Sequence, residues 1–274
     1  GEKNSDVSAW VYETARGKAV KIDLGDMTDT YLPRMKWTND HNELCVFKMN
    51  RHQNKLQLYK VDIKSYKSSV FYEEANKYYI DITDDLTFLS DKKHFIWSSE
   101  KEGFNQLYLM NMDGKQSVKL TTGSYDVTTF YGVDEKNKKI YFQAEEKSPL
   151  NKQIFSVDLD GKNLVNLTPS LSGCNSAQFS STFDYFINNH STINTAPTYT
   201  VYDRFGKKVR TIEDNVNYPK IQEEYGVSPV EFFTFTTSEN VKLNGWMIKP
   251  RDFNPTRKYP VFMTQYSGPG SQSV

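Results

Sequence analysis

Four segments of the chain repeat one pattern at intervals of 43 to 51 residues, and this periodicity limits the possible folds more than any other feature. The segments begin near an aromatic residue, at Trp37, Phe88, Tyr131 and Phe179. Each continues with an apolar strand, a second strand, a short turn and a third strand. Repeats of this length are typical of architectures in which one small supersecondary unit stacks against the next.

The second strands of the four segments are rich in apolar and aromatic residues: LQLYKVD, NQLYLMNMDG, KQIFSVDLDG and PTYTVYDRFG. Tight turns are predicted after the last three, at Asp113-Gly114, Asp160-Gly161 and Phe205-Gly206. Glycine suits such turns because it tolerates positive φ. The third strands are then predicted over residues 117–120, 163–167 and 208–212.

A lone four-stranded sheet of this kind cannot bury both of its faces, so the units are expected to stack radially into a propeller. Helical alternatives are disfavoured, because β-branched and aromatic residues dominate and no amphipathic run has the length of a helix. No WD dipeptide or double glycine recurs, which separates the pattern from WD40 and kelch repeats. The sequence therefore predicts an all-β fold, an irregular β-propeller.

The predicted propeller is partial. Four repeats, together with opening strands expected over residues 7–12 and 19–23, make about four to five blades. An open ring of blades exposes two sheet edges, which is an aggregation hazard. We therefore expect this chain to be an internal fragment of a longer protein, with further blades upstream.

The pattern changes after Tyr218, where Pro219, Gly226 and Pro229 interrupt the chain. The run EFFTFTTSENVKLNGWMIKP then predicts a hairpin with strands over residues 232–237 and 242–248. A compact buried strand is predicted over residues 261–265, ending at SGPG. These segments do not continue the repeats. We therefore predict two domains, a propeller portion over residues 1–225 and the truncated beginning of another domain over residues 226–274.

Charge and composition exclude several classes of function. Thirty-four Lys and Arg balance thirty-four Asp and Glu, without a basic stripe, so nucleic acid and anionic membrane surfaces are poor partners. The apolar stretches are too short for a membrane-spanning helix. Two cysteines, Cys45 and Cys174, lie in no CxxC or CxxH pattern and are interpreted as buried or idle thiols, with a disulfide as the alternative. The four histidines have no metal-site spacing, and no cofactor or metal is predicted.

The C-terminal run GWMIKPRDFNPTRKYPVFMTQYSGPGSQSV resembles the start of the α/β-hydrolase domain in enzymes of the prolyl oligopeptidase family. It is most similar to the dipeptidyl peptidase IV branch, whose loop has the form Tyr-x-Gly-Pro-x-Ser-Gln. Upstream, YLPRMKWTNDHNELCVFKMNRHQNKLQLY and KYYIDITDDLTFL resemble propeller segments of the same branch. The resemblance covers essentially the whole chain and implies a partial propeller followed by the first strands of an α/β-hydrolase domain.

This resemblance implies a catalytic role for Tyr266. In the family, the loop after the third hydrolase strand carries the oxyanion hole, and its tyrosine hydroxyl stabilises the tetrahedral intermediate. A preorganised donor aimed at charge that develops in the transition state contributes about 3–4 kcal/mol. Without the resemblance, Tyr266 would be interpreted as one of eighteen packed tyrosines that ends a strand.

The remaining catalytic residues are expected outside this chain. The nucleophile elbow G-x-S-x-G occurs nowhere in the sequence. In α/β-hydrolases the triad serine, aspartate and histidine follow the oxyanion loop in that order. We therefore expect no peptidase activity from this chain alone.

Two further features of the family concern substrate binding. A pair of glutamates holds the free amino terminus of the substrate; we interpret the adjacent Glu73 and Glu74 as a solvated loop pair and expect the true pair upstream. By position in the family pattern, Tyr79 and Asp81 are candidate substrate-binding residues, with ordinary blade packing as the alternative. The run Tyr79-Ile80-Asp81 does not reproduce the aromatic–arginine pair of the mammalian enzymes.

The resemblance implies that the parent protein is a serine exopeptidase releasing Xaa-Pro or Xaa-Ala dipeptides, with the propeller gating access of peptide substrates. Relatives are commonly periplasmic or at the cell surface and often homodimeric, so the same is expected here. Two alternatives stay open: an endo-acting or acylaminoacyl member of the prolyl oligopeptidase family, and a non-enzymatic propeller that binds partners. The hydrolase-like segment over residues 232–272 argues against the second alternative.

Overall fold

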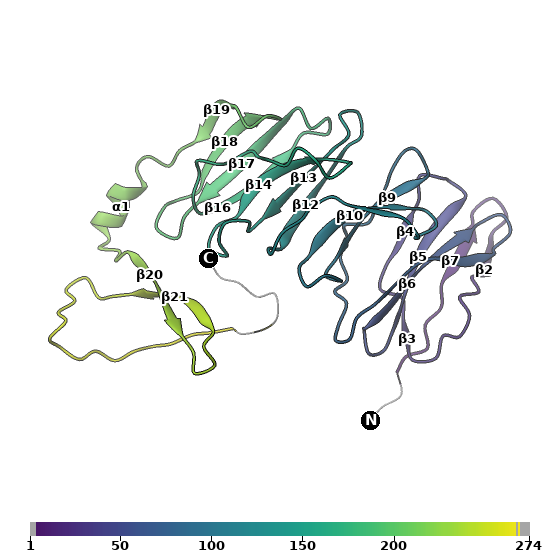
Figure 1. Cartoon of the computed structure of the whole chain (residues 1–274), viewed down its shortest axis with the longest axis horizontal. Coiled ribbons are helices and arrows are strands. Elements are labelled where there is room, and N and C mark those ends of the chain that lie inside the picture. Colours follow the sequence, from purple (N-terminus) through teal and green to yellow (C-terminus); the bar gives the residue numbers. More distant parts are fainter. Residues whose placement is uncertain (1–3, 267, 269–274) are drawn as a thin grey trace. The chain divides into compact units, whose positions relative to one another are not determined.

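The computed structural model describes residues 4–266 and 268, and its regular structure is almost entirely β (Figure 1). A two-stranded hairpin of β1 (Trp10–Glu13) and β2 (Lys18–Lys21) comes first. Four larger sheets follow, each built from consecutive strands of the chain. This succession of separate sheets confirms the predicted all-β propeller portion of about four to five blades.

The first two sheets contain the first two predicted repeats. The strands of the first sheet are β3 (Thr30–Tyr31), β4 (Met35–Trp37), β5 (Glu43–Asn50), β6 (Lys55–Asp62) and β7 (Ser68–Ala75). They are arranged in the order β3-β5-β6-β7, and β4 pairs with the other end of β5 from β3. The second has the order β11-β10-β9-β8; its strands are β8 (Thr87–Phe88), β9 (His94–Ser99), β10 (Gln106–Asn111) and β11 (Ser117–Lys119).

The third and fourth sheets contain the remaining repeats in simple sequence order. The third comprises β12 (Val127–Asp134), β13 (Lys139–Ala144), β14 (Gln153–Asp158) and β15 (Val165–Asn166). The fourth comprises β16 (Cys174–Phe179), β17 (Tyr185–Ser191), β18 (Thr198–Asp203) and β19 (Lys208–Glu213). The aromatic residues that mark the four repeats therefore lie in β4, β8, β12 and β16.

An aromatic cluster joins the first and second sheets. Phe71 and Tyr72 of β7 meet Phe95 and Trp97 of β9, with ring centroids 5.5 to 6.1 Å apart in edge-to-face arrangements. Such pairs stabilise a core beyond the area that they bury. All four side chains are less than a tenth exposed, so this interface is a continuous hydrophobic core.

Three glycines sit at equivalent turns and touch the sheet before their own. Gly114, Gly161 and Gly206 all have positive φ, as predicted. A Cβ on Gly114 would lie 2.1 Å from the carbonyl oxygen of Phe71. The corresponding distances are 2.6 Å from Gly161 to the Lys119 carbonyl oxygen and 2.6 Å from Gly206 to that of Leu167. Each turn therefore packs its backbone directly against the outer strand of the preceding sheet.

Aspartates hold several turns between strands. Asp62 accepts backbone N–H groups of Lys64 and Ser65 at 3.0 and 2.7 Å, and Asp40 accepts that of Asn42 at 2.9 Å. Asx turns of this kind replace the backbone hydrogen bonds that a turn leaves unmade.

After the fourth sheet come one short helix, α1 (Tyr218–Glu224), and the hairpin of β20 (Val230–Thr236) and β21 (Lys242–Ile248). The Asn194 side chain holds the start of this hairpin, because it exchanges two hydrogen bonds of 2.8 and 2.9 Å with the backbone of Val230. The predicted hairpin is therefore formed.

The strand predicted over residues 261–265 is not formed, and this prediction is wrong. Val261, Phe262 and Met263 are at least 80% exposed rather than buried. A strand requires neighbours for its backbone N–H and C=O groups, and no strand of the described residues pairs with this segment.

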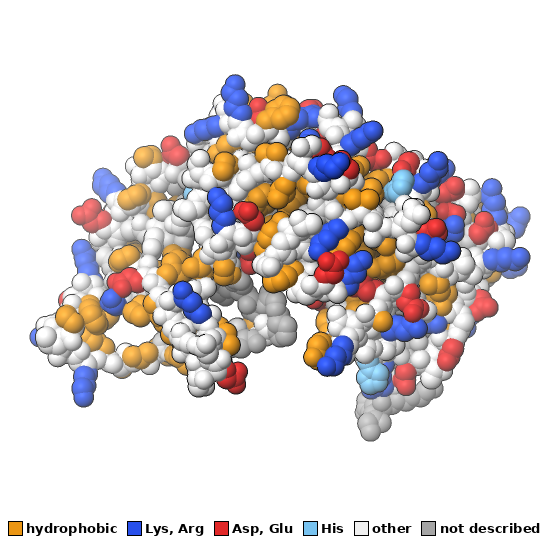
Figure 2. All heavy atoms as spheres, viewed as in Figure 1, with side chains coloured by type: hydrophobic (Ala, Val, Ile, Leu, Met, Phe, Trp, Pro, Cys, Tyr) orange, Lys and Arg blue, Asp and Glu red, His pale blue; other side chains and the backbone are white. Residues whose placement is uncertain are grey.

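The chain divides into two compact units, one with residues 1–144 and 156–165, the other with residues 145–155 and 166–274. The domain boundary predicted between residues 225 and 226 stays a prediction. On the face shown in Figure 2, Lys and Arg side chains are interspersed with Asp and Glu. Within the described residues, no helix has the length and apolar character needed to cross a membrane.

Candidate functional site

Tyr266 follows the exposed segment after the second hairpin, and its side chain is 81% exposed. Gly268 lies against the ring, since a Cβ on Gly268 would come within 2.9 Å of Tyr266 Cε1 and 3.4 Å of its hydroxyl oxygen. Glycine at position 268 therefore allows the backbone to come this close to the ring. The other residues of the predicted loop, Ser267 and residues 269–272, lie outside the described residues.

The two predicted substrate-binding residues, Tyr79 and Asp81, lie together in the wall of one cavity. They belong to the loop that follows β7, and the Tyr79 hydroxyl donates to Gln53 Oε1 at 3.2 Å. The cavity has a volume of about 70 Å³ and lies within the first compact unit. Tyr266 belongs to the other compact unit, whereas Tyr79 and Asp81 line this one cavity together.

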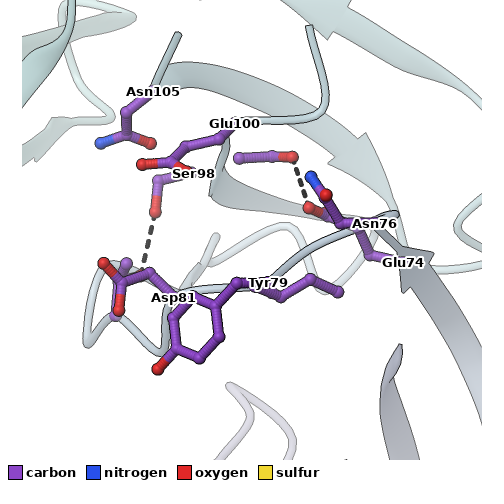
Figure 3. A pocket seen from close by; sticks show the side chains of 10 residues that line it. Glu74, Asn76, Tyr79, Asp81, Ser98, Glu100 and Asn105 are labelled. Carbon is purple, nitrogen blue, oxygen red and sulfur yellow. Dashed lines mark hydrogen bonds between the residues drawn. The ribbon is translucent and has the colours of Figure 1, made fainter. Parts of the chain in front are cut away.

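Strand β9 and the turn after it form the opposite wall of this cavity. Figure 3 shows Ser98, Glu100 and Asn105 facing Asp81 and Tyr79, with Glu74 and Asn76 at one end. The lining is rich in carboxylates, hydroxyls and amides and contains no Lys or Arg. Its chemistry therefore suits hydrogen-bonded polar groups and disfavours anionic ones.

Glu74 is the residue of this site that the sequence analysis misjudged. Glu73 and Glu74 lie on β7 rather than in a loop, and only Glu73 is solvated, beside Lys55. Glu74 is 8% exposed, and its Oε2 atom accepts hydrogen bonds from the Tyr72 hydroxyl at 2.7 Å and Trp97 Nε1 at 2.9 Å. Its Oε1 atom accepts from Ser99 Oγ at 2.7 Å.

One local signal for this burial is present in the sequence. Residues two apart on a strand point to the same face, and Tyr72 precedes Glu74 by two. The other two donors lie 23 and 25 residues further along the chain, so only the fold brings them to Glu74. Burial and the charge of Glu74 together raise the pKa of Tyr72, which keeps its hydroxyl a donor.

Two other carboxyl groups near the cavity have raised pKa values. Partial burial, with the charges of Asp81, Asp126 and Glu74, raises the pKa of Glu100. Burial chiefly raises the pKa of Asp85, although a hydrogen bond from Ser98 opposes the shift. The charged forms of these groups are therefore held at some electrostatic cost at neutral pH.

A second cavity, of about 330 Å³, lies within the other compact unit. Leu150, Cys174, Ile193 and Phe232 contribute to its lining. Burial raises the pKa of the Cys174 thiol, which lowers its reactivity. Cys45 is buried and Cys174 is half-buried. Among residues 4–266 and 268, no three His, Cys, Asp or Glu side chains are grouped so as to hold a metal ion.

Comparison with known proteins assigns this arrangement to a family. The family model of the dipeptidyl peptidase IV N-terminal region matches residues 1–197. The crystal structure of Porphyromonas gingivalis dipeptidyl peptidase 4 matches with a TM-score of 0.92 at 36% identity, over 99% of this chain and 38% of that one.

Curated relatives give the same result. Dipeptidyl peptidase 4 of Arthroderma otae is 28% identical over 254 residues, which cover 90% of this chain and 33% of the relative. Dipeptidyl peptidase 4 of Trichophyton rubrum gives the same identity and coverage. The chain therefore spans about a third of the length of these relatives.

Proposed function

Because this chain belongs to the dipeptidyl peptidase IV family, we propose that it is part of a serine exopeptidase that releases Xaa-Pro or Xaa-Ala dipeptides from peptide amino termini. The observation that carries this proposal is the match to the family over residues 1–197, extended by the likeness to the Porphyromonas gingivalis enzyme over 99% of the chain. The chain corresponds to a third of its relatives, so the proposed activity is that of a longer protein.

In this proposal the Tyr266 hydroxyl donates to the oxygen that becomes negative when a serine attacks the substrate carbonyl. The proposal is supported by the run Tyr-Ser-Gly-Pro-Gly-Ser-Gln and by the exposure of the phenol. Gly268 allows the backbone to lie beside the ring, and the exposure of the side chain leaves the phenol accessible to a substrate. Loss of one such donor costs about 100- to 1000-fold in kcat.

The propeller portion would then limit access to the catalytic centre, and the cavity beside Tyr79 and Asp81 would receive part of the peptide. Support comes from the polar lining of the cavity, whose carboxylates, hydroxyls and amides match the donors and acceptors of a peptide backbone. The family also supports a periplasmic or cell-surface location and a homodimeric parent, which cell fractionation and light scattering of the parent would test.

The test of the catalytic proposal is Tyr266→Phe in the full-length protein, assayed with a Gly-Pro chromogenic substrate. We expect kcat to fall about 100-fold or more while KM changes little, because the donor acts on charge that develops in the transition state. Tyr225→Phe is the matched control, since Tyr225 is 77% exposed and lies on another element.

Equal turnover by the wild-type and Tyr266→Phe proteins would overturn the oxyanion assignment. Hydrolysis of a substrate with a blocked amino terminus would instead favour an endo-acting enzyme. Absence of hydrolysis of either substrate by the wild-type protein would contradict the proposed activity as a whole.

A further inference from the structure

The loop that carries Tyr79 and Asp81 is tied to strand β9 at both of its ends. Before the loop, Glu74 accepts the hydroxyl of Ser99 at 2.7 Å. After the loop, the hydroxyls of Thr83 and Ser98 lie 2.9 Å apart in a hydrogen bond. Two consecutive residues of β9 therefore bound the segment that forms one wall of the cavity (Figure 3).

Between these ties the loop contacts the turn between β5 and β6. The backbone N–H of Asn76 donates to the Asn54 carbonyl at 2.9 Å, and that of Ile80 donates to the Gln53 carbonyl at 2.8 Å. These contacts hold the loop to its own sheet. The contacts of Glu74 and Thr83 are different, because they hold it to the next sheet and so set the width of the cavity.

Glu74 suits this task because Tyr72, Trp97 and Ser99 all donate hydrogen bonds to its carboxylate. Trp97 is 2% exposed, and its indole N–H can only donate, so it requires an acceptor at this point. A carboxylate offers enough lone pairs to accept from Tyr72, Trp97 and Ser99 at once. Buried networks with every member satisfied are rigid, and loss of the shared acceptor leaves several groups unpaired.

We propose that Glu74 is a positioning residue of the substrate cavity: its buried carboxylate ties β7 to β9 and thereby fixes Tyr79 and Asp81 at the distance from Glu100 and Asn105 that substrate binding requires. The proposal rests on the assignment of this cavity to peptide binding. It gives a role to a buried carboxylate that the proposed catalytic chemistry does not use.

Two substitutions separate the role of the acceptor from that of the charge. In Glu74→Gln the amide oxygen still accepts from Tyr72 and Trp97, while the amide N–H donates to Ser99, whose hydroxyl can also accept. In Glu74→Ala the indole N–H of Trp97 stays buried without a partner. Glu73→Gln is the control on the neighbouring, exposed position of β7.

The first measurement is steady-state hydrolysis of a Gly-Pro chromogenic substrate by the full-length protein. Glu74→Ala is expected to raise KM about tenfold with kcat within about twofold of wild type, because the cavity wall is displaced while the catalytic groups stay in place. Glu74→Gln and Glu73→Gln are expected to keep the wild-type KM. An effect on stability alone would lower the melting temperature of Glu74→Ala without changing its KM, and this result would overturn the proposal.

The second measurement is amide hydrogen exchange, which does not depend on activity. Residues 76–83 of Glu74→Ala are expected to exchange about tenfold faster, with residues 185–191 of β17 unchanged. Unchanged exchange at 76–83 would refute the tie itself. Faster exchange with an unchanged KM would refute the link to substrate. If the wild-type protein hydrolyses no dipeptidyl substrate, the proposed function fails, whereas the exchange measurement still decides whether Glu74 fixes the loop.

Discussion

Replacing Gly114 by alanine tests whether the joint between the first two sheets depends on a residue without a side chain. Gly114 has a φ of +66°, and the Cβ of an alanine would lie 2.1 Å from the Phe71 carbonyl oxygen and 3.2 Å from Tyr72 Cα. Both contacts are with backbone atoms, so no change of rotamer can relieve them. The turn, β7 or both must therefore move.

The expected loss of stability in Gly114→Ala is the sum of two contributions. An alanine at positive φ costs about 1–2 kcal/mol relative to its preferred conformations. Insertion of a methyl group into a packed site costs a further 1–3 kcal/mol or so. Gly25 provides the matched control, because its φ of +71° is nearly the same and no atom lies within 4 Å of its Cβ position. Gly25→Ala is therefore expected to lose only the conformational contribution, about 1–2 kcal/mol of unfolding free energy.

The assay is urea unfolding of both variants, followed by circular dichroism and by tryptophan fluorescence, to which Trp97 contributes from the core between these two sheets, where it is 2% exposed. Gly114→Ala should be less stable than Gly25→Ala by about 1–3 kcal/mol. Equal stability of the two variants, within about 0.5 kcal/mol, would refute the argument that the Phe71 carbonyl excludes a side chain.

Two further predictions concern titratable groups. Burial raises the pKa of Asp85 above its ordinary value of 3.8, so the folded state binds this proton more tightly and loses stability as pH rises through that value. Asp85→Asn should therefore gain stability relative to wild type between pH 3 and pH 7 in paired unfolding curves; a pH-independent difference would contradict this sign. Burial also raises the pKa of the Cys45 thiol to about 12, so Cys45 should resist iodoacetamide at pH 8 until urea unfolds the chain. Rapid labelling of Cys45 in the folded protein would disprove its burial.

The repeats made most of the fold predictable from the sequence. Repeated runs rich in apolar and aromatic residues marked the strands, and the paired signals of Asp113-Gly114 and Asp160-Gly161 marked turns that need positive φ. These are local properties, because a strand and its turn are encoded by neighbouring residues. What each glycine touches was not predictable, since the Phe71 carbonyl lies more than forty residues before Gly114.

The candidate site was predictable only in part, for the same reason. Tyr79 and Asp81 were singled out by family pattern, and the structure places them in one cavity wall. Glu74 was predicted to be a solvated loop residue because it stands at the junction before the second repeat, and glutamates are seldom fully buried. Its burial depends on contacts with Trp97 and Ser99 from the next sheet, and no local sequence pattern predicts those contacts. The prediction for residues 261–265 was wrong in the opposite direction, because a buried strand was predicted and the segment is exposed. Its apolar residues indicated a strand, but a strand also needs a neighbouring strand to pair with.

The aspartate turns give the sheets a shared sensitivity to acid. Hydrogen bonds from neighbouring amides hold the pKa of Asp40 and of Asp62 below the usual range, and the Asn163 side chain and Lys139 do the same for Asp158. A carboxyl with a lowered pKa contributes stability above its ordinary value, and this contribution disappears as pH falls through the lowered one. Turns in the first and third sheets would thus both lose stability as pH falls, although they are far apart in the sequence. Protons therefore act as a ligand that these turns share, and the unfolded chain binds that ligand more tightly than the folded chain does.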